Sequence, residues 1–229
     1  MIYGLETIGT LLLMLVSFAI VIGAQMYLTS TYNENKKKKN KMNLTGFEIA
    51  KKILDENNLG NIYVVEVKGS LSDHYDPTRK VVRLSSDIFH GESIAALAIA
   101  AHECGHAIQD KENYVFMRIR ATMVPFVNLV TYLGYIGLII SLFAGITGYL
   151  TISIGLIIIA LAFQLITLPV EFDASRKAMD QIESLGLIDS SEKEYSEKVL
   201  KAAAYTYIAS LVSLVIDLLR LIIIAKNRD

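Results

Sequence analysis

The stretch ATMVPFVNLVTYLGYIGLIISLFAGITGYLTISIGLIIIALAFQLITLPV, residues 121–170, contains no Asp, Glu, Lys, Arg or His. A helix needs roughly 20 apolar residues to cross a bilayer core about 30 Å thick, so this stretch has room for two passes. The segment Ala144 to Gly148, with a glycine near each end, offers the turn between them. The stretch therefore predicts a transmembrane hairpin of two helices in a membrane protein.

The composition of the whole chain agrees with this class. Hydrophobic residues make up 53% of the 229 residues, the mean hydropathy is +0.43 and charged residues make up 20%, below the roughly 25% of ordinary soluble domains. The apolar content excludes a disordered chain, and a formal net charge of -1 gives no electrostatic footprint for nucleic acid. Cys104 is the one cysteine, so no disulfide can form within the chain.

Two further apolar stretches are long enough to cross a membrane. Ile8 to Leu28 has no basic residue before it and lacks a cleavage site at a suitable distance, so we interpret it as a retained anchor. Ala202 to Ala225 carries Asp217 and Arg220, whose i,i+3 spacing lets them neutralise each other on one helical face. The sequence thus predicts about four transmembrane helices in a mainly α-helical protein.

Five lysines between positions 36 and 41 follow the first stretch directly. Basic loops stay on the cytoplasmic side, so the amino terminus is expected outside and the polar segments 29–120 and 171–201 in the cytoplasm, where they can build one site. The expected parts are an anchor (1–30), a catalytic domain (31–120), a transmembrane hairpin (121–168), cytoplasmic helices (169–201) and a final membrane helix (202–229).

Local signals within the polar segments predict a small α+β domain. Thr45 and Glu48 form a capping box at the start of a short helix, and the sequence from Glu92 to Gln109 favours a second helix. Two β-branched runs, 62–67 and 80–84, are joined by a turn-rich stretch and predict a small hairpin or edge pair. Pro169 is suited to the first turn of a later helix.

The segment Ala101-His-Glu-Cys-Gly-His106 carries the most specific chemical signal. Residues four apart share a helix face, so His102 and His106 can present their imidazoles to one divalent ion, while Glu103 can reach a ligand of that ion. Two histidines and a carboxylate suit one Zn²⁺ and leave a position for a water that the metal acidifies and the adjacent carboxylate deprotonates. Gly105 lacks a Cβ and lets another element approach closely.

A third ligand must come from elsewhere in the chain. Glu171 leads, because it follows Pro169 at the point where a bilayer-anchored helix leaves the membrane. An acidic residue at a helix start can also simply complement the helix dipole. Asp173 is the competitor, but it faces another direction and is a candidate for supporting the site from outside the ligand set.

The chain resembles the YugP-like membrane zinc metallopeptidases and, more distantly, HtpX-type membrane proteases and CAAX prenyl proteases. Four stretches carry the resemblance, which covers nearly the whole chain: Asp73 to Ser85, Ser93 to Gln109, Leu168 to Arg176 and Val199 to Tyr207. The resemblance implies a zincin-like domain of the gluzincin kind, with His102, His106 and Glu171 as metal ligands and Glu103 as the catalytic carboxylate. HtpX-type enzymes usually carry Asp four residues after the third ligand, where this chain has Ser175.

Several weaker candidates complete the expected site. His74 or Arg176 can donate to the oxyanion of peptide hydrolysis, although His74 can equally be a plain turn residue and Arg176 can pair with Asp173 or Asp180. Cys104 is interpreted as a packing residue. The segment Val81, Val82 and Arg83 is expected to form an edge strand that binds an extended substrate through its backbone.

These observations favour a zinc-dependent endopeptidase of the cell membrane that cleaves peptides or membrane proteins at the cytoplasmic surface, with quality control as its expected task. Two alternatives remain. A site-2-type intramembrane protease also uses the His-Glu-x-x-His motif, but the apolar lead-in from Ile94 to Ala101 is too short to span, and no later span holds a Leu-Asp-Gly-like motif. A transporter or membrane scaffold with a structural zinc would need a closed four-ligand site.

Overall fold

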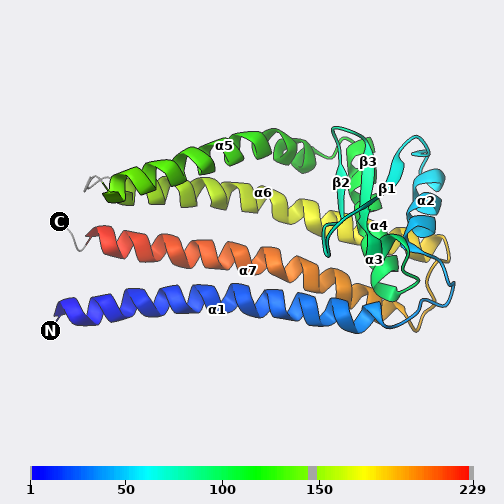
Figure 1. Cartoon of the computed structure of the whole chain (residues 1–229), viewed down its shortest axis with the longest axis horizontal. Helices are drawn as coiled ribbons and strands as arrows, with labels where there is room; N and C mark the ends of the chain where they lie inside the picture. Colours follow the sequence, from blue (N-terminus) through cyan, green and yellow to red (C-terminus); the bar gives the residue numbers. More distant parts are fainter. Residues whose placement is uncertain (1, 144–148, 227–229) are drawn as a thin grey trace. The chain divides into compact units, whose positions relative to one another are not determined.

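The computed structural model describes residues 2–143 and 149–226, which divide into two compact units. Unit 1 comprises residues 1–25, 118–168 and 206–229, and unit 2 comprises residues 26–117 and 169–205. The elements in chain order are α1 (Ile2–Lys36), α2 (Gly46–Glu56), β1 (Tyr63–Val67), β2 (His74–Asp76), β3 (Val81–Ser85), α3 (Ser86–Phe89), α4 (Ile94–Lys111), α5 (Val115–Phe143), α6 (Tyr149–Ser184) and α7 (Lys193–Lys226) (Figure 1).

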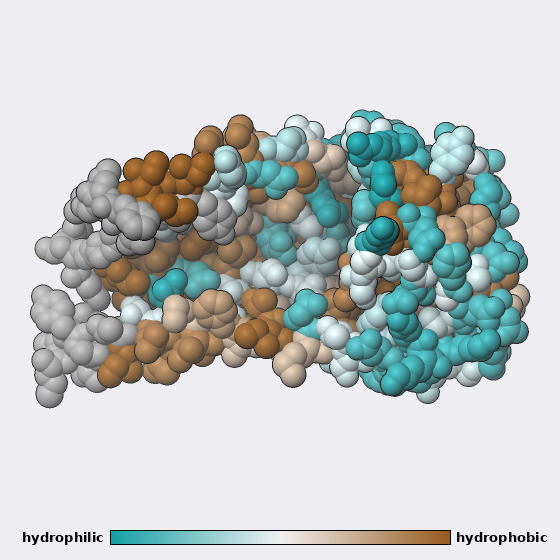
Figure 2. Space-filling model, in the orientation of Figure 1, coloured by the Kyte–Doolittle hydropathy of each residue, from teal (hydrophilic) through white to brown (hydrophobic). Residues whose placement is uncertain are grey.

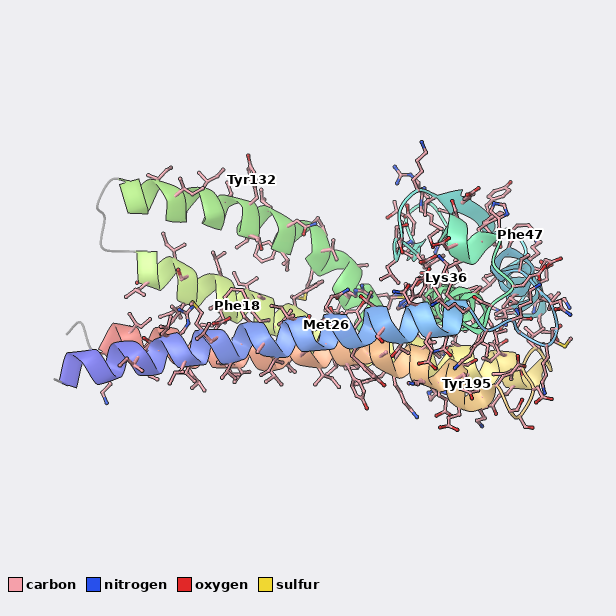
Figure 3. The ribbon with its side chains drawn as sticks, turned by 60° about the horizontal axis from the view of Figure 1, so that its bottom comes forward. Phe18, Met26, Lys36, Phe47, Tyr132 and Tyr195 are labelled. Carbon is pink, nitrogen blue, oxygen red and sulfur yellow. The ribbon has the colours of Figure 1, made fainter. Side chains whose placement is uncertain are left out.

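Unit 1 consists of the apolar parts of the long helices α1, α5, α6 and α7, and hydrophobic residues predominate on its coloured surface in Figure 2. Within the described residues, three helical stretches are long and apolar enough to cross a membrane: Ile8–Lys36, Leu150–Ser184 and Lys193–Lys226. Large side chains such as Phe18 and Tyr132 are exposed there (Figure 3), as suits a lipid environment. The sequence predicts a further pass over α5, which stays a prediction, and its expected turn at 144–148 lies outside the described residues.

A small polar cluster links α1 and α7 inside unit 1. Asp217 pairs with Arg220 at 3.3 Å, as their i,i+3 spacing predicts, and it also accepts a hydrogen bond from the Ser17 hydroxyl at 3.1 Å. Ser17 in turn lies 2.5 Å from the Ser213 hydroxyl. These partners compensate the two charges, which is the structural role that the sequence favours for them.

Unit 2 is built on a three-stranded sheet of order β1-β3-β2. β3 pairs in parallel with β1 and antiparallel with β2. The two runs expected at 62–67 and 80–84 do pair with each other, but the pair is parallel, so the expected hairpin is wrong. The edge position expected for Val81, Val82 and Arg83 is also wrong, because β1 and β2 take the two edges. A parallel pair cannot be joined by a tight turn, and the longer connection between β1 and β3 contains the short strand β2.

The helices α2 and α4 pack against this sheet and against each other through the apolar residues that the sequence pattern predicts to be buried. The capping box of Thr45 and Glu48 forms as predicted, and α2 buries Ile49, Ile53 and Leu54. The helix α4 begins after Ser93, whose hydroxyl accepts the Ala96 N–H at 3.1 Å. Most of α4 is buried, so its position relative to the sheet is held by side-chain packing along nearly its whole length.

The helix α6 runs without a break through Pro169. The expected helix start at this proline is therefore wrong, and Glu171 lies in the interior of a helix instead of its first turn. Proline removes one backbone donor, but helices with a long apolar length tolerate that loss when neighbouring groups satisfy the freed carbonyl.

The lysines after α1 make specific contacts. Lys36 pairs with Asp87 and Lys39 pairs with Glu92, and Lys41 pairs with Asp189 at 2.9 Å. The Lys38 ammonium lies 3.8 Å from the centroid of the Tyr195 ring; Lys36 and Tyr195 are labelled in Figure 3. These contacts fasten the lysine segment to the rest of unit 2.

Candidate metal centre

Three side chains from the two polar segments meet in unit 2. His102 and His106 lie on α4, and Glu171 lies on α6. The Glu171 carboxylate oxygen Oε2 is 3.3 Å from Nε2 of His102 and 3.7 Å from Nε2 of His106, and one ligand atom from each residue lies within 4.8 Å of the others. The side chains of the three residues are at most 13% exposed. The structure thus brings together the three residues that the sequence singles out.

The close approach of α4 and α6 at this point depends on Gly105. A Cβ at this position would lie 2.5 Å from the backbone oxygen of Ala174 and 3.2 Å from its Cα. Atoms at that separation would overlap, so only glycine lets the two helices come so close. The reason expected for a glycine inside the motif is therefore confirmed by the packing.

The buried Gln109 fixes the protonation pattern of His106. Its amide nitrogen donates to the Val170 carbonyl at 2.8 Å and to Asp173 Oδ2 at 2.9 Å, so its amide oxygen must be the atom that lies 3.0 Å from His106 Nδ1. An oxygen can only accept, and Nδ1 therefore carries the hydrogen. Nε2, which faces Glu171, is then the nitrogen of His106 that can bind a metal.

Ser175 lies at Nδ1 of His102, as Gln109 lies at Nδ1 of His106. Its hydroxyl lies 3.2 Å from His102 Nδ1, one helical turn after Glu171 on the same face of α6. When Nε2 of His102 binds a metal, Nδ1 carries the hydrogen and donates it to the Ser175 oxygen. Sequence reasoning named Ser175 only as a departure from the HtpX pattern and missed Gln109, although an i,i+3 partner of His106 on one helix was a signal that could have found it.

Glu103 lies beside the group of three and is 7% exposed. Burial raises the pKa of its carboxyl to about 7, opposed in part by the neighbouring His102. The backbone of Tyr75 in β2 lies near this carboxylate and also opposes the rise of its pKa. A carboxylate with a pKa near neutrality can both take up and release a proton at physiological pH.

The edge strand β2 is attached to α4 through its side chains. The Tyr75 hydroxyl donates to Asp110 at 2.7 Å, and Lys80 pairs with the same carboxylate. At the start of the strand, Asp73 accepts the Ser85 N–H at 2.7 Å, and burial raises the pKa of the Asp73 carboxyl. These contacts hold Glu103 and the backbone of β2 in a fixed relation.

The remaining candidates have partners outside the group of three. His74 is exposed on β2 with Nδ1 2.8 Å from the Ser72 carbonyl oxygen. Arg176 pairs with both Asp173 and Asp180, as the sequence suggested. Cys104 is fully buried with its Sγ 3.6 Å from the Ala50 carbonyl oxygen, and burial raises the pKa of its thiol, in agreement with its interpretation as a packing residue.

The geometry of the three side chains fits a zinc ion. Two imidazole nitrogens and a carboxylate oxygen at about 2.0–2.2 Å from one tetrahedral zinc stand about 3–4 Å apart, the range of the separations from Glu171 to the two histidines. Both imidazoles also have a hydrogen-bond partner at Nδ1, which leaves Nε2 for the metal.

Comparison with known proteins agrees with this reading of the site. Residues 10–226 match the profile of a family described as "putative neutral zinc metallopeptidase". The chain is also 40% identical over 204 residues to the "putative membrane protease YugP" of Bacillus subtilis strain 168, an alignment that covers 89% of this chain and 91% of that protein. A search of solved structures found no match.

Proposed function

Because the chain belongs to the family of neutral zinc metallopeptidases, we propose that it is a membrane-bound zinc-dependent endopeptidase of the gluzincin kind. The observation that carries this proposal is the meeting of His102, His106 and Glu171, with the carboxylate of Glu103 beside them. The three apolar helices and the membrane protease among the relatives support a location in the membrane.

In this proposal His102, His106 and Glu171 hold one zinc ion. When bound, the zinc supplies a Lewis acid that acidifies a water and polarises the carbonyl of the substrate. Ser175 and Gln109 keep the imidazoles in the orientation that directs Nε2 towards the ion. Asp173 supports the site indirectly: it accepts a hydrogen bond from Gln109, which in turn orients the imidazole of His106.

Glu103 moves the proton. Its carboxylate takes a proton from the attacking water and passes it to the nitrogen of the leaving amine, a role for which burial and a pKa of about 7 suit it. The backbone of Tyr75 lies near this carboxylate, on the side where β2 meets α4.

The substrate lies beside β2 in this proposal. β3 is paired on both sides, so it cannot offer free backbone groups, whereas β2 is an edge strand and the backbone of its Tyr75 lies near Glu103. An extended peptide that pairs with an edge strand gains affinity without a strong demand on its side chains. His74 on this strand is the better candidate for a donor to the oxyanion, because the guanidinium of Arg176 is already engaged by two carboxylates.

The proposed location is the cytoplasmic face, with membrane proteins that expose unfolded segments as substrates and quality control as the task. A structural zinc site in a transporter or scaffold is the second candidate, and it needs a fourth protein ligand. Cys104, the one cysteine, is turned to the Ala50 carbonyl of α2 and cannot supply it without a rearrangement of the core.

The proposal is tested on the detergent-purified chain by elemental analysis and by cleavage of an unfolded protein. His102→Ala, His106→Ala and Glu171→Ala are each expected to lose zinc, whereas Glu103→Gln keeps zinc and loses about 10²–10⁴-fold in kcat. Asp180→Ala, an exposed carboxylate on the same helix as Glu171, is the control and keeps its zinc. Zinc at the wild-type level in Glu171→Ala removes this residue from the ligand set, and full activity in Glu103→Gln contradicts the proposed reaction.

A further inference from the structure

A groove of about 400 Å³ lies between α6 and α7 within unit 2. In Figure 1 this part of the two helices is drawn in yellow and orange, and the chain reverses direction between them. One stripe of each helix lines the groove, at spacings of three and four residues. Its apolar lining consists of Phe172, Met179, Leu200 and Ala204.

The groove adjoins the candidate metal centre through Ser175. This residue lines the groove, and its hydroxyl lies 3.2 Å from Nδ1 of His102. Phe172, another lining residue, directly follows Glu171 in the chain. The groove therefore reaches His102 through a single residue, Ser175, on the Nδ1 side of the imidazole ring.

The charged groups around the groove neutralise one another. Arg176 pairs with Asp180 at 3.1 Å, Lys193 with Glu183 at 2.8 Å, and Lys201 pairs with Glu197 on α7. Three cations and three carboxylates leave no net charge to attract an ionic group. The chemistry of the lining therefore favours an uncharged, apolar occupant.

We propose that this groove receives a large apolar side chain of the substrate, next to the peptide bond that is cut. The inference rests on the proposed function, and it adds a preference that backbone pairing along β2 cannot supply. The volume is within the range of about 300–1,000 Å³ typical of sites for small ligands, which is enough for a bulky side chain with its backbone. The continuity through Ser175 makes a substrate the occupant, since a substrate is the molecule that must reach the metal centre.

The test compares two peptides that differ in one residue, after mass spectrometry of the digest of an unfolded protein has identified the cut positions. The first peptide keeps leucine at the preferred flanking position, and the second has glycine there. Met179→Trp fills the groove without touching a ligand. The readout is the ratio of kcat/KM for the leucine peptide to kcat/KM for the glycine peptide, together with zinc content as a check of folding.

Wild type is expected to favour leucine, and Met179→Trp is expected to lower the ratio roughly tenfold or more. Glu194→Trp adds the same side chain at an exposed position of α7 outside the groove lining and should leave the ratio unchanged. If Met179→Trp does not fold, Met179→Ala widens the groove and should shift the preference from leucine towards tryptophan.

The outcomes separate the two proposals. If the wild type cleaves and the Met179 variants have the same ratio of kcat/KM values, the groove is not a substrate site. The groove then binds a lipid chain or no ligand, and the proposed peptidase activity is unaffected. A zinc-loaded wild type that cleaves no protein overturns the proposed function, and the groove proposal fails with it.

Discussion

The hydroxyl oxygen of Ser175 lies 3.2 Å from Nδ1 of His102, on the side of the imidazole ring away from the nitrogen that faces Glu171. A neutral hydroxyl thus stands where the HtpX-type enzymes that the chain resembles usually carry an aspartate. A hydroxyl accepts a weaker hydrogen bond than a carboxylate does, so the ring is oriented but its basicity is raised less.

We expect Ser175→Ala to weaken zinc binding by about tenfold, because His102 Nδ1 loses its partner. Zinc affinity is measured by competition with a chelator of known affinity. Ser184→Ala, at an exposed position of the same helix, serves as the control. An unchanged affinity in Ser175→Ala would show that the hydroxyl does not orient the ring.

Gln109→Leu is expected to lower both stability and zinc affinity. The change removes the side-chain donor of the Val170 carbonyl and of Asp173 Oδ2 and leaves His106 Nδ1 without its acceptor. We expect a cost of about 1–3 kcal/mol in the free energy of unfolding and about 10–100-fold in zinc binding. Thermal unfolding and chelator competition measure the two effects. Gln181→Leu, which breaks a hydrogen bond to Asn57 away from the site, should lower stability less and keep the zinc affinity.

Gly105→Ala tests the close approach of α4 and α6. The new methyl group meets the backbone of Ala174, which cannot rotate out of the way, so we expect a loss of about 1–3 kcal/mol and a lower zinc content. At Gly23 in α1 nothing lies within 4 Å of an added Cβ, so Gly23→Ala should leave the melting temperature equal or higher. Equal melting temperatures for Gly105→Ala and wild type would mean that the helices separate at no cost.

Lys39 and Lys193 are expected to face the cytoplasm. Both belong to unit 2, and the lysines after α1 favour the cytoplasmic side for their segment. Single cysteines at these positions in a Cys104→Ala background should react with a membrane-impermeant reagent only after the cells are opened. Labelling of either cysteine in intact cells would place unit 2 outside and rule out the proposed substrates.

The three residues that meet in unit 2 could be singled out from the sequence because simple relations mark them. His102 and His106 follow from the i,i+4 geometry of one helix, and Glu171 follows from its place directly after the apolar stretch that ends at Val170. Gln109 and Ser175 act on the imidazoles through geometry that the motif does not specify. Ser175 reaches His102 only through the packing of α6 against α4, which no local pattern fixes.

The two corrections have the same origin. The run at 80–84 has the β-branched residues of a strand, but its neighbours in the sheet are chosen by tertiary packing, and the three residues of β2 are too short to give a periodic signal. Pro169 carries the signal of a helix start, yet the apolar helix before it continues through it because lost backbone bonds can be satisfied by neighbours. Local sequence preferences thus predict which residues form strands and helices, but they do not predict which strands pair or where a long helix ends.

The unbroken helix α6 also sets the position of Glu171 relative to the apolar residues of the same helix. From Leu150 to Val170 its apolar length is about 30 Å at 1.5 Å per residue, close to the thickness of a bilayer core, and Glu171 follows at once. The direction of the Glu171 carboxylate is therefore set by the same helix that carries the apolar length. One residue inserted between Val170 and Glu171 would turn this carboxylate by about 100° around α6 and away from His102 and His106.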